Sequence, residues 1–94
     1  MTNFSLPKKV LIPEEVLFQE IEGEGVLLNL KNEQYFGLNE MGTRIWHLLS
    51  ENGLPENALV RLQKEYKIDE DTLRVDLAEL IAELNRQGLV STED

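Results

Sequence analysis

The chain has 94 residues, the size of one small domain with a single core. Its 41% hydrophobic and 29% charged residues are typical of a globular protein and exclude a disordered one. No apolar run approaches the roughly 18–20 residues that cross a bilayer, so we expect no transmembrane segment.

Charge and cysteine content exclude further classes of protein. Cysteine is absent, which excludes disulfides, thiolate metal sites and thiol nucleophiles. The first ten residues lack the apolar centre of a signal peptide, so we expect a cytoplasmic protein. Eighteen acidic and nine basic residues give a formal net charge of −9. This charge disfavours nucleic acids, which are bound largely through cations. It suits a neutral or basic partner, or serves solubility alone.

The first third of the chain has the pattern of extended structure. An irregular, proline-containing arm is expected over residues 1–13. From residue 14 apolar and polar residues alternate loosely up to a turn at Glu22–Gly25, where the glycines favour a hairpin. Strands at Val26–Leu30 and Gln34–Leu38 follow. Because the connecting loops are short, we expect a three-stranded antiparallel meander.

Three helices are expected over residues 39–90, which gives a single domain of the α+β class. Asn39 is a candidate N-cap for the first helix, which ends at Asn52-Gly53. The second helix begins at Pro55, where a missing N–H costs nothing. The third is capped by Asp69, covers Glu70–Gln87 and stops at Gly88, before a polar tail at residues 91–94.

The residues that could support catalysis are few. His47 is the single histidine and lies within an expected amphipathic helix, where a surface role is more common than general-base chemistry. The turn around Glu24 lacks the lysine of a phosphate-binding loop. Glu22 and Glu24 have no third ligand at a suitable spacing, and helix capping explains the acidic run at Asp69–Asp71. We therefore expect no enzyme, no catalytic residues, no metal and no cofactor.

The third expected strand and the third expected helix suggest a binding site. Gln34–Leu38 leads directly into a helix, so this strand is expected to keep an unpaired edge. The helix places four leucines on its core face and continues its apolar surface on one flank, while the opposite flank, with Asp76 and Glu79, is polar. An extended peptide could pair with the edge and insert alternate side chains against that apolar flank. The candidate peptide-binding residues are Gln34, Tyr35, Phe36, Gly37 and Leu38 on the strand and Asp71, Arg74, Val75, Ala78 and Ile81 on the helix.

Two alternatives to this groove remain open. The alanines of the helix could reflect helix propensity alone. Gly37 could mark a bulge before the first helix, and not a place where a partner backbone approaches. The pattern also does not decide which of Tyr35 and Phe36 faces the groove.

Several segments together resemble the PqqD-like family of recognition elements for ribosomally made, post-translationally modified peptides. The resemblance covers about residues 10–90, and the segments that carry it are Gly25–Leu30, Tyr35–Trp46 and Leu84–Val90. Tyr66–Asp69 and the Asp76-Leu77 pair of the last helix also fit the family pattern. It implies a winged-helix-like fold of three strands followed by three helices. Members of this family bind the leader of a precursor peptide as an added strand between the third strand and the third helix.

The resemblance also implies a partner enzyme. Such proteins present the precursor to a separate modifying enzyme or leader peptidase, and Tyr35–Asn39 is most similar to standalone members of lasso-peptide pathways. A basic residue of the leader would meet Asp71 or Glu79. The protein would be a monomer or a weak dimer paired through its open edges.

The alternative function is that of a winged-helix regulator that binds DNA. The order of the elements is compatible with it. The candidate recognition helix, Pro55–Tyr66, carries only Arg61 and Lys64 against Glu56 and Glu65, and the chain as a whole is strongly acidic. We therefore favour the peptide-binding hypothesis.

Overall fold

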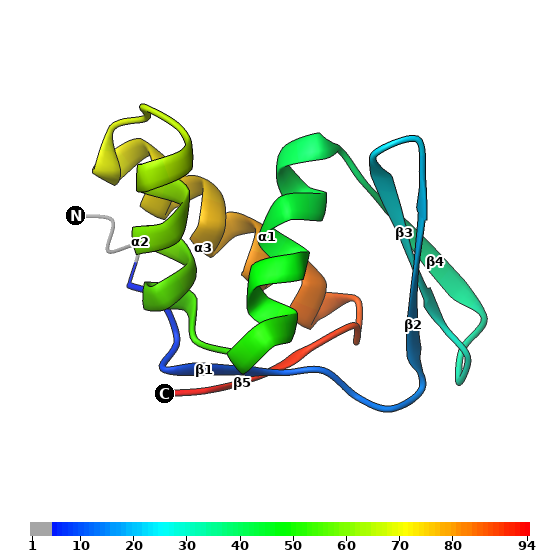
Figure 1. Ribbon diagram of the computed structural model, residues 1–94. Helices are drawn as coiled ribbons and strands as arrows, with labels where there is room; N and C mark the ends of the chain where they lie inside the picture. The colour runs from blue at the N-terminus through cyan, green and yellow to red at the C-terminus, as the bar shows by residue number, and fades with distance from the viewer. Residues whose placement is uncertain (1–4) are drawn as a thin grey trace.

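The computed structural model describes residues 5–94 and contains two small sheets and three helices (Figure 1). The predicted α+β class, with a three-stranded antiparallel sheet followed by three helices, is confirmed. No helix within residues 5–94 is long and apolar enough to cross a membrane. The elements are β1 (Lys9–Leu11), β2 (Val16–Ile21), β3 (Glu24–Asn29), β4 (Gln34–Leu38), α1 (Glu40–Asn52), α2 (Pro55–Glu65), α3 (Glu70–Arg86) and β5 (Ser91–Glu93).

Two hairpins build the main sheet in the order β2-β3-β4. The first turn consists of Glu22 and Gly23, whose φ angles of 53° and 83° both lie in the left-handed region. Two such residues make a type I′ turn, whose twist matches that of the paired strands. The second hairpin turns through residues 30–33, with Glu33 also at a positive φ of 61°. Short connections of this kind make β2 and β4 the two edges of the sheet.

The helix ends follow the capping residues that the sequence indicates. The side chain of Asn39 accepts a hydrogen bond from the Gly42 N–H at 2.8 Å at the start of α1. The side chain of Asp69 accepts one from the Thr72 N–H at 3.2 Å at the start of α3. Gly53, with φ of 72°, ends α1 in the left-handed conformation. Each cap satisfies backbone groups that the helix itself leaves unpaired.

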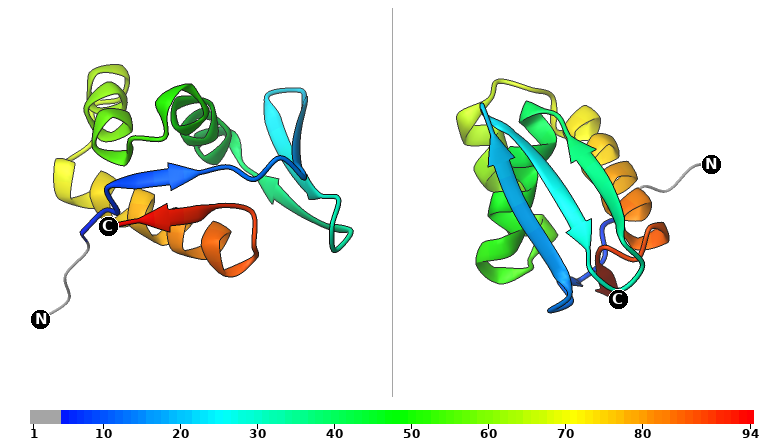
Figure 2. Two further views of the ribbon diagram at one scale, coloured as in Figure 1. Left: turned by 90° about the horizontal axis from the view of Figure 1, so that it is seen from below. Right: turned by 90° about the vertical axis from the view of Figure 1, so that its right-hand side faces the viewer.

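The core lies between the inner face of the main sheet and the three helices. Figure 2 shows the sheet from its outer side, with α1 behind β2 and β3 and with α3 beside β4. Burying a leucine side chain stabilises a fold by roughly 1.5–3 kcal/mol, and the core consists largely of such side chains. The largest fully buried ones are Leu27, Leu49, Leu62, Leu73, Leu77 and Leu84.

The two ends of the chain differ from the sequence analysis, which treats residues 1–13 as an irregular arm and residues 91–94 as a polar tail. Each end contributes one strand, and β1 pairs with β5 in a separate antiparallel ladder. Val10 is buried in the centre of β1, and its N–H donates to the Gly53 carbonyl at 2.7 Å. The two strands are far apart in sequence, so the local sequence pattern does not predict that they pair. Residues 1–4 of the predicted arm lie outside the described part of the chain.

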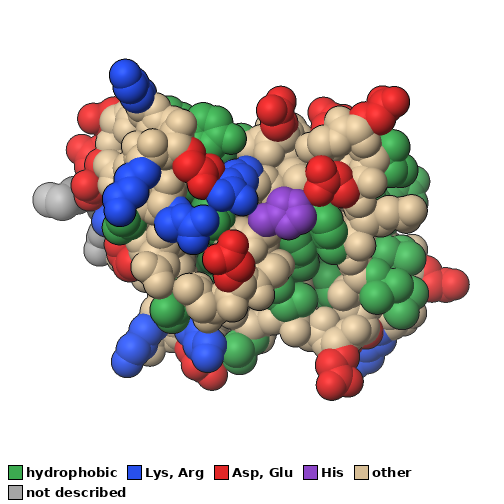
Figure 3. Space-filling model, in the orientation of Figure 1, with side chains coloured by type: hydrophobic (Ala, Val, Ile, Leu, Met, Phe, Trp, Pro, Cys, Tyr) green, Lys and Arg blue, Asp and Glu red, His purple; other side chains and the backbone are tan. Residues whose placement is uncertain are grey.

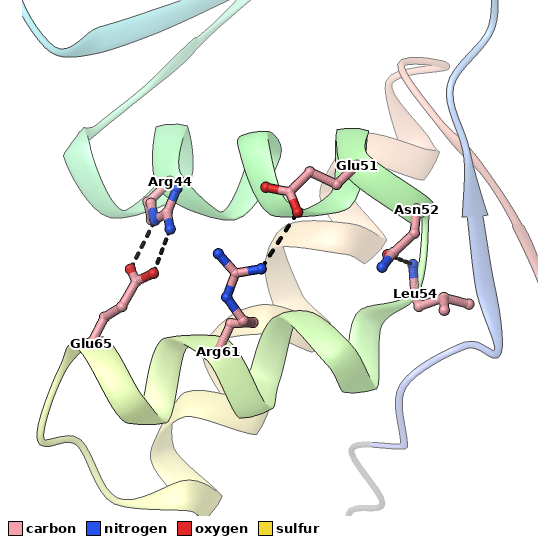
Figure 4. A network of polar contacts seen from close by, with 6 residues as sticks. All are labelled: Arg44, Glu51, Asn52, Leu54, Arg61 and Glu65. Atoms are coloured by element: carbon pink, nitrogen blue, oxygen red, sulfur yellow. Dashed lines mark hydrogen bonds and ion pairs between the residues drawn. The ribbon is translucent and has the colours of Figure 1, made fainter.

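Ion pairs join α1 to α2 on the surface (Figure 4). Arg44 Nε donates to Glu65 Oε1 at 2.8 Å, and a second bond joins the same two side chains. Arg61, which lies one turn before Glu65 on α2, contacts Glu51 of α1 at 3.4 Å. The hydrogen bonds from Arg44 lower the pKa of Glu65 below its usual value. Both side chains of the Arg44–Glu65 pair remain about one third exposed (32%), so water and salt screen the attraction.

The hydroxyl of Thr43 joins the sheet to α1, which leads to the first prediction. The buried Thr43 Oγ1 accepts from the Gly25 N–H at 2.7 Å and lies 3.5 Å from the Leu38 carbonyl. Thr43→Val keeps the shape but leaves the Gly25 N–H without that acceptor, so we expect a loss of about 1–3 kcal/mol in the free energy of unfolding. Urea unfolding measures it. The control is Thr72→Val on exposed α3 surface; equal effects of both variants would contradict this role.

A second prediction concerns the pH dependence of the stability that Glu65 contributes. A lowered pKa for Glu65 in the folded protein means that its contribution to stability is present at pH values above the unfolded pKa and is lost as the pH falls through the folded value. Glu65→Gln should therefore destabilise the protein at pH 7, and the difference from wild type should shrink progressively as the pH falls below the ordinary value of 4.5 towards the lowered pKa of the folded protein. Urea midpoints at pH 7 and at about pH 3 measure this. A constant difference at both pH values would show that the pair contributes nothing through charge.

Candidate functional site

One edge of the main sheet is open. β4 pairs with β3 on one side, and no other strand within residues 5–94 pairs with it on the other side. The N-terminal arm, which could have covered this edge, pairs with β5 instead. Unpaired edges normally invite association with another extended chain. The edge predicted at Gln34–Leu38 is therefore present in the structure.

The register of the sheet determines which backbone groups of β4 face outward. The β2–β3 turn has two residues, so Ile21 and Glu24 form a hydrogen-bonded pair, and the amides of β3 point alternately towards β2 and towards β4 from there. The Gly25 N–H, which points to Thr43 on the β4 side, agrees with this alternation.

The same alternation continues on β4. Residues 34, 36 and 38 stand opposite Asn29, Leu27 and Gly25 and direct their backbone groups towards β3. Tyr35 and Gly37 therefore direct their N–H and C=O groups towards the open edge. Two residues with four free groups are available to a further strand.

A cleft of about 380 Å³ lies next to this edge. We call it the β4 cleft; its walls come from β4, from the first turns of α1 and from the middle of α3. The right-hand view of Figure 2 shows α3 alongside β4, and residues of both elements line the cleft. Most of its lining is apolar or small, and the residues are Phe36, Gly37, Leu38, Asn39, Met41, Gly42, Ile45, Asp76 and Leu80.

The two aromatic residues of β4 lie on opposite faces of the sheet. Phe36 lines the β4 cleft, whereas Tyr35 is 78% exposed and lies on the outer face. The question that the sequence left open is thus decided in favour of Phe36. Gly37 pairs with Val26 in an unbroken register, so no bulge occurs there. A Cβ atom at Gly37 would meet nothing within 4 Å, which leaves room for an approaching backbone.

The helix residues that the sequence analysis selected do not line the β4 cleft. Ile81 is only 2% exposed and belongs to the core. Arg74 pairs with Glu56 of α2 at 2.7 Å. Ala78 lies with Ile81 in a separate hollow of about 210 Å³ beside Ser5, Pro7 and β5. Asp71 and Val75 are likewise outside the lining of the β4 cleft.

Asp76 and Leu80 take the place of those residues on α3. The helical periodicity gives the correct angles between side chains. The orientation expected for α3 was wrong because it treated the sheet as the only neighbour of this helix. In the structure α3 also packs against α2, and the N-terminal segment and β5 lie over its apolar flank. The flank that remains at β4 is the one with Asp76. The sequence does contain a signal for this flank, because Asp76 precedes Leu80 by one helical turn and the two side chains therefore lie on the same side of α3. The expected orientation of the helix, however, turns Asp76 away from the groove.

Two other surface features lie outside the β4 cleft. A hollow of about 380 Å³ on the outer face of the sheet is lined mostly by apolar side chains, among them Leu17, Leu28 and Tyr35. Figure 3 shows apolar side chains gathered at the sheet end of the molecule. His47 Nε2 lies 2.9 Å from Glu20 Oε1, and the histidine ring stands edge-on to Phe18. This contact joins α1 to β2.

Comparisons with known proteins agree with this geometry. The sequence profile of the family described as coenzyme PQQ synthesis protein D (PqqD) matches residues 24–90. No curated protein matches the chain in sequence. A solved structure of TbiB1 in complex with the TbiA(beta) leader peptide is 36% identical, with a TM-score of 0.82 over 86% of this chain and 94% of that chain.

A second solved structure, lasso peptide synthetase B1 complexed with the leader peptide, is 22% identical. Its TM-score is 0.79 over 87% of this chain and 96% of that chain, and at this identity the likeness shows the fold alone. The profile match covers more than half of the chain and includes the open strand, the β4 cleft and all three helices. The chain therefore belongs to the PqqD family.

Proposed function

We propose that this protein is a non-catalytic module that captures the leader of a ribosomally made precursor peptide by strand addition. The observation that carries the proposal is the open edge of β4 beside the β4 cleft. The similarity to TbiB1, whose structure is a complex with a leader peptide, supports the same assignment. A lasso-peptide pathway is the setting that this similarity favours.

The free groups of Tyr35 and Gly37 give the added strand its main-chain hydrogen bonds. A peptide residue opposite Phe36 would place its side chain on the inner side of the sheet and thus in the β4 cleft. There it would contact Phe36 and Leu80. Main-chain bonds contribute about 0.5–1.5 kcal/mol each, and with buried side chains a roughly micromolar affinity is reasonable, about −8 kcal/mol.

DNA binding is the less favoured function. The candidate recognition helix corresponds to α2, whose Arg61 contacts Glu51 at 3.4 Å and whose Glu65 is paired with Arg44. Arg61, one of the two basic residues of α2, is thus partly neutralised. The formal net charge of −9 opposes the approach of phosphates.

A separate enzyme would carry out the modification or the cleavage of the precursor peptide. The bound leader would hold the precursor for a modifying enzyme or a leader peptidase in the cytoplasm. His47, the residue type most suited to proton transfer, contacts Glu20 and Phe18 on the surface away from the β4 cleft. The leader would occupy the edge through which two copies could pair, so the peptide-bound protein should be a monomer at that edge.

A backbone variant tests strand addition. Gly37→Pro removes an N–H that faces the open edge, whereas Gly37→Ala keeps it and meets no neighbouring atom. We expect Gly37→Pro to weaken peptide binding at least about tenfold and Gly37→Ala to leave it nearly unchanged. Fluorescence polarisation with labelled TbiA(beta) leader, or with peptides selected from a random library, measures this. Binding by neither kind of peptide, or equal binding by both variants, would refute the proposal.

A matched pair of truncations on α3 tests the place of the site. Leu80→Ala removes a side chain that lines the β4 cleft, and Val75→Ala removes one outside it. Leu80→Ala should weaken peptide binding about five- to thirtyfold, which corresponds to a loss of about 1–2 kcal/mol in binding free energy. Val75→Ala should have little effect on the affinity. Titration calorimetry measures both affinities, and circular dichroism checks the folds. The reverse order would place the peptide on the flank that the sequence analysis selected.

A further inference from the structure

Asp76 is the one charged side chain among the residues that line the β4 cleft. The other polar side chain of the lining, Asn39, is already used as the cap of α1, where it accepts from the Gly42 N–H. The rest of the lining is apolar or glycine. A single carboxylate therefore sets the electrostatic character of this cleft.

The carboxylate of Asp76 has no ion pair or hydrogen bond within residues 5–94. All four arginines of this part of the chain are paired with other carboxylates. Arg74, which lies on the same helix, contacts Glu56 of α2 and Glu70. Asp76 is also exposed to solvent, so its carboxylate remains accessible to a cation from outside.

Asp76 and Leu80 have the spacing that an added strand requires. Four residues of α-helix rise about 6 Å along the helix axis. Side chains on the same face of a strand repeat every two residues, which is about 6.6–6.8 Å. Because α3 runs alongside β4 (Figure 2), two successive inward side chains of a bound peptide can meet Leu80 and Asp76 in turn.

We infer that the leader recognised by this protein carries a lysine or arginine two residues from an apolar side chain, and that Asp76 binds this cation. The inference rests on the proposed function and specifies the class of peptide that the β4 cleft selects. The apolar side chain packs on Phe36 and Leu80, and the basic one extends to the carboxylate. This assignment replaces Asp71 and Glu79, the acidic partners expected from the sequence, which lie outside the β4 cleft.

A peptide-display selection tests the inference. Random peptides of about 12 residues are selected on wild type, on Asp76→Asn and on Glu79→Gln, a control that removes the same charge from the same helix outside the β4 cleft. Wild type and Glu79→Gln should enrich a basic residue two positions from an apolar one. Asp76→Asn should keep the apolar preference and lose the basic one. The same basic enrichment on Asp76→Asn, or none on wild type, would overturn the inference.

Affinities of one selected peptide give the size of the effect. Replacing its basic residue with norleucine should weaken binding to wild type about two- to fivefold and leave binding to Asp76→Asn unchanged. Raising the salt from about 0.05 M to about 0.5 M should remove most of that difference. A norleucine peptide that binds wild type as tightly as the basic peptide would refute the role of Asp76.

The selection also separates this inference from the proposed function. If the selected peptides lose binding to Gly37→Pro but show no basic preference, strand addition stands and only the role of Asp76 fails. If no peptide is selected, or if binding is indifferent to Gly37→Pro, the proposed function itself fails.

Discussion

The functional surface depends on where the N-terminal strand pairs. β1 pairs with β5, and the burial of Val10 and its bond to the Gly53 carbonyl hold β1 against the connection between α1 and α2, so it does not pair with β4. The backbone groups of Tyr35 and Gly37 therefore remain free. An open edge carries a risk of self-association. The formal charge of −9 reduces that risk, because copies of the chain repel one another.

The walls of the β4 cleft are held by the same contacts that hold the fold. Only Asn39 separates β4 from α1, and Thr43 joins α1 back to the Gly25 amide of β3. The far end of α3 is joined to the sheet through Asn29, whose side-chain amide donates to the Gly88 carbonyl at 3.2 Å. A cleft built from such elements is formed before any peptide arrives, so less conformational entropy is lost on binding.

The sequence predicts those parts of the structure that local chemistry determines. The caps at Asn39 and Asp69 and the stop at Gly53 act within a few residues, and each is found where the pattern places it. The predicted turn at Glu22–Gly25 is also present but is narrower, since Glu22 and Gly23 alone form it and β3 already begins at Glu24. The pairing of β1 with β5 and the rotation of α3 depend on residues far apart in sequence. A helical period cannot decide whether Ile81 or Leu80 faces β4, since both belong to the apolar side of the helix.

In strand addition, backbone hydrogen bonds and side-chain contacts have different effects on binding. Main-chain bonds to Tyr35 and Gly37 accept almost any sequence in the added strand, so they supply affinity without selecting a particular peptide. Selection must come from the side chains that meet the peptide on its inner face. The fold tolerates large changes elsewhere, because a structure with 22% identity still superposes with a TM-score of 0.79. If the proposed function holds, side chains that line the β4 cleft, such as Leu80 and Asp76, are therefore the positions at which one scaffold would distinguish different peptides.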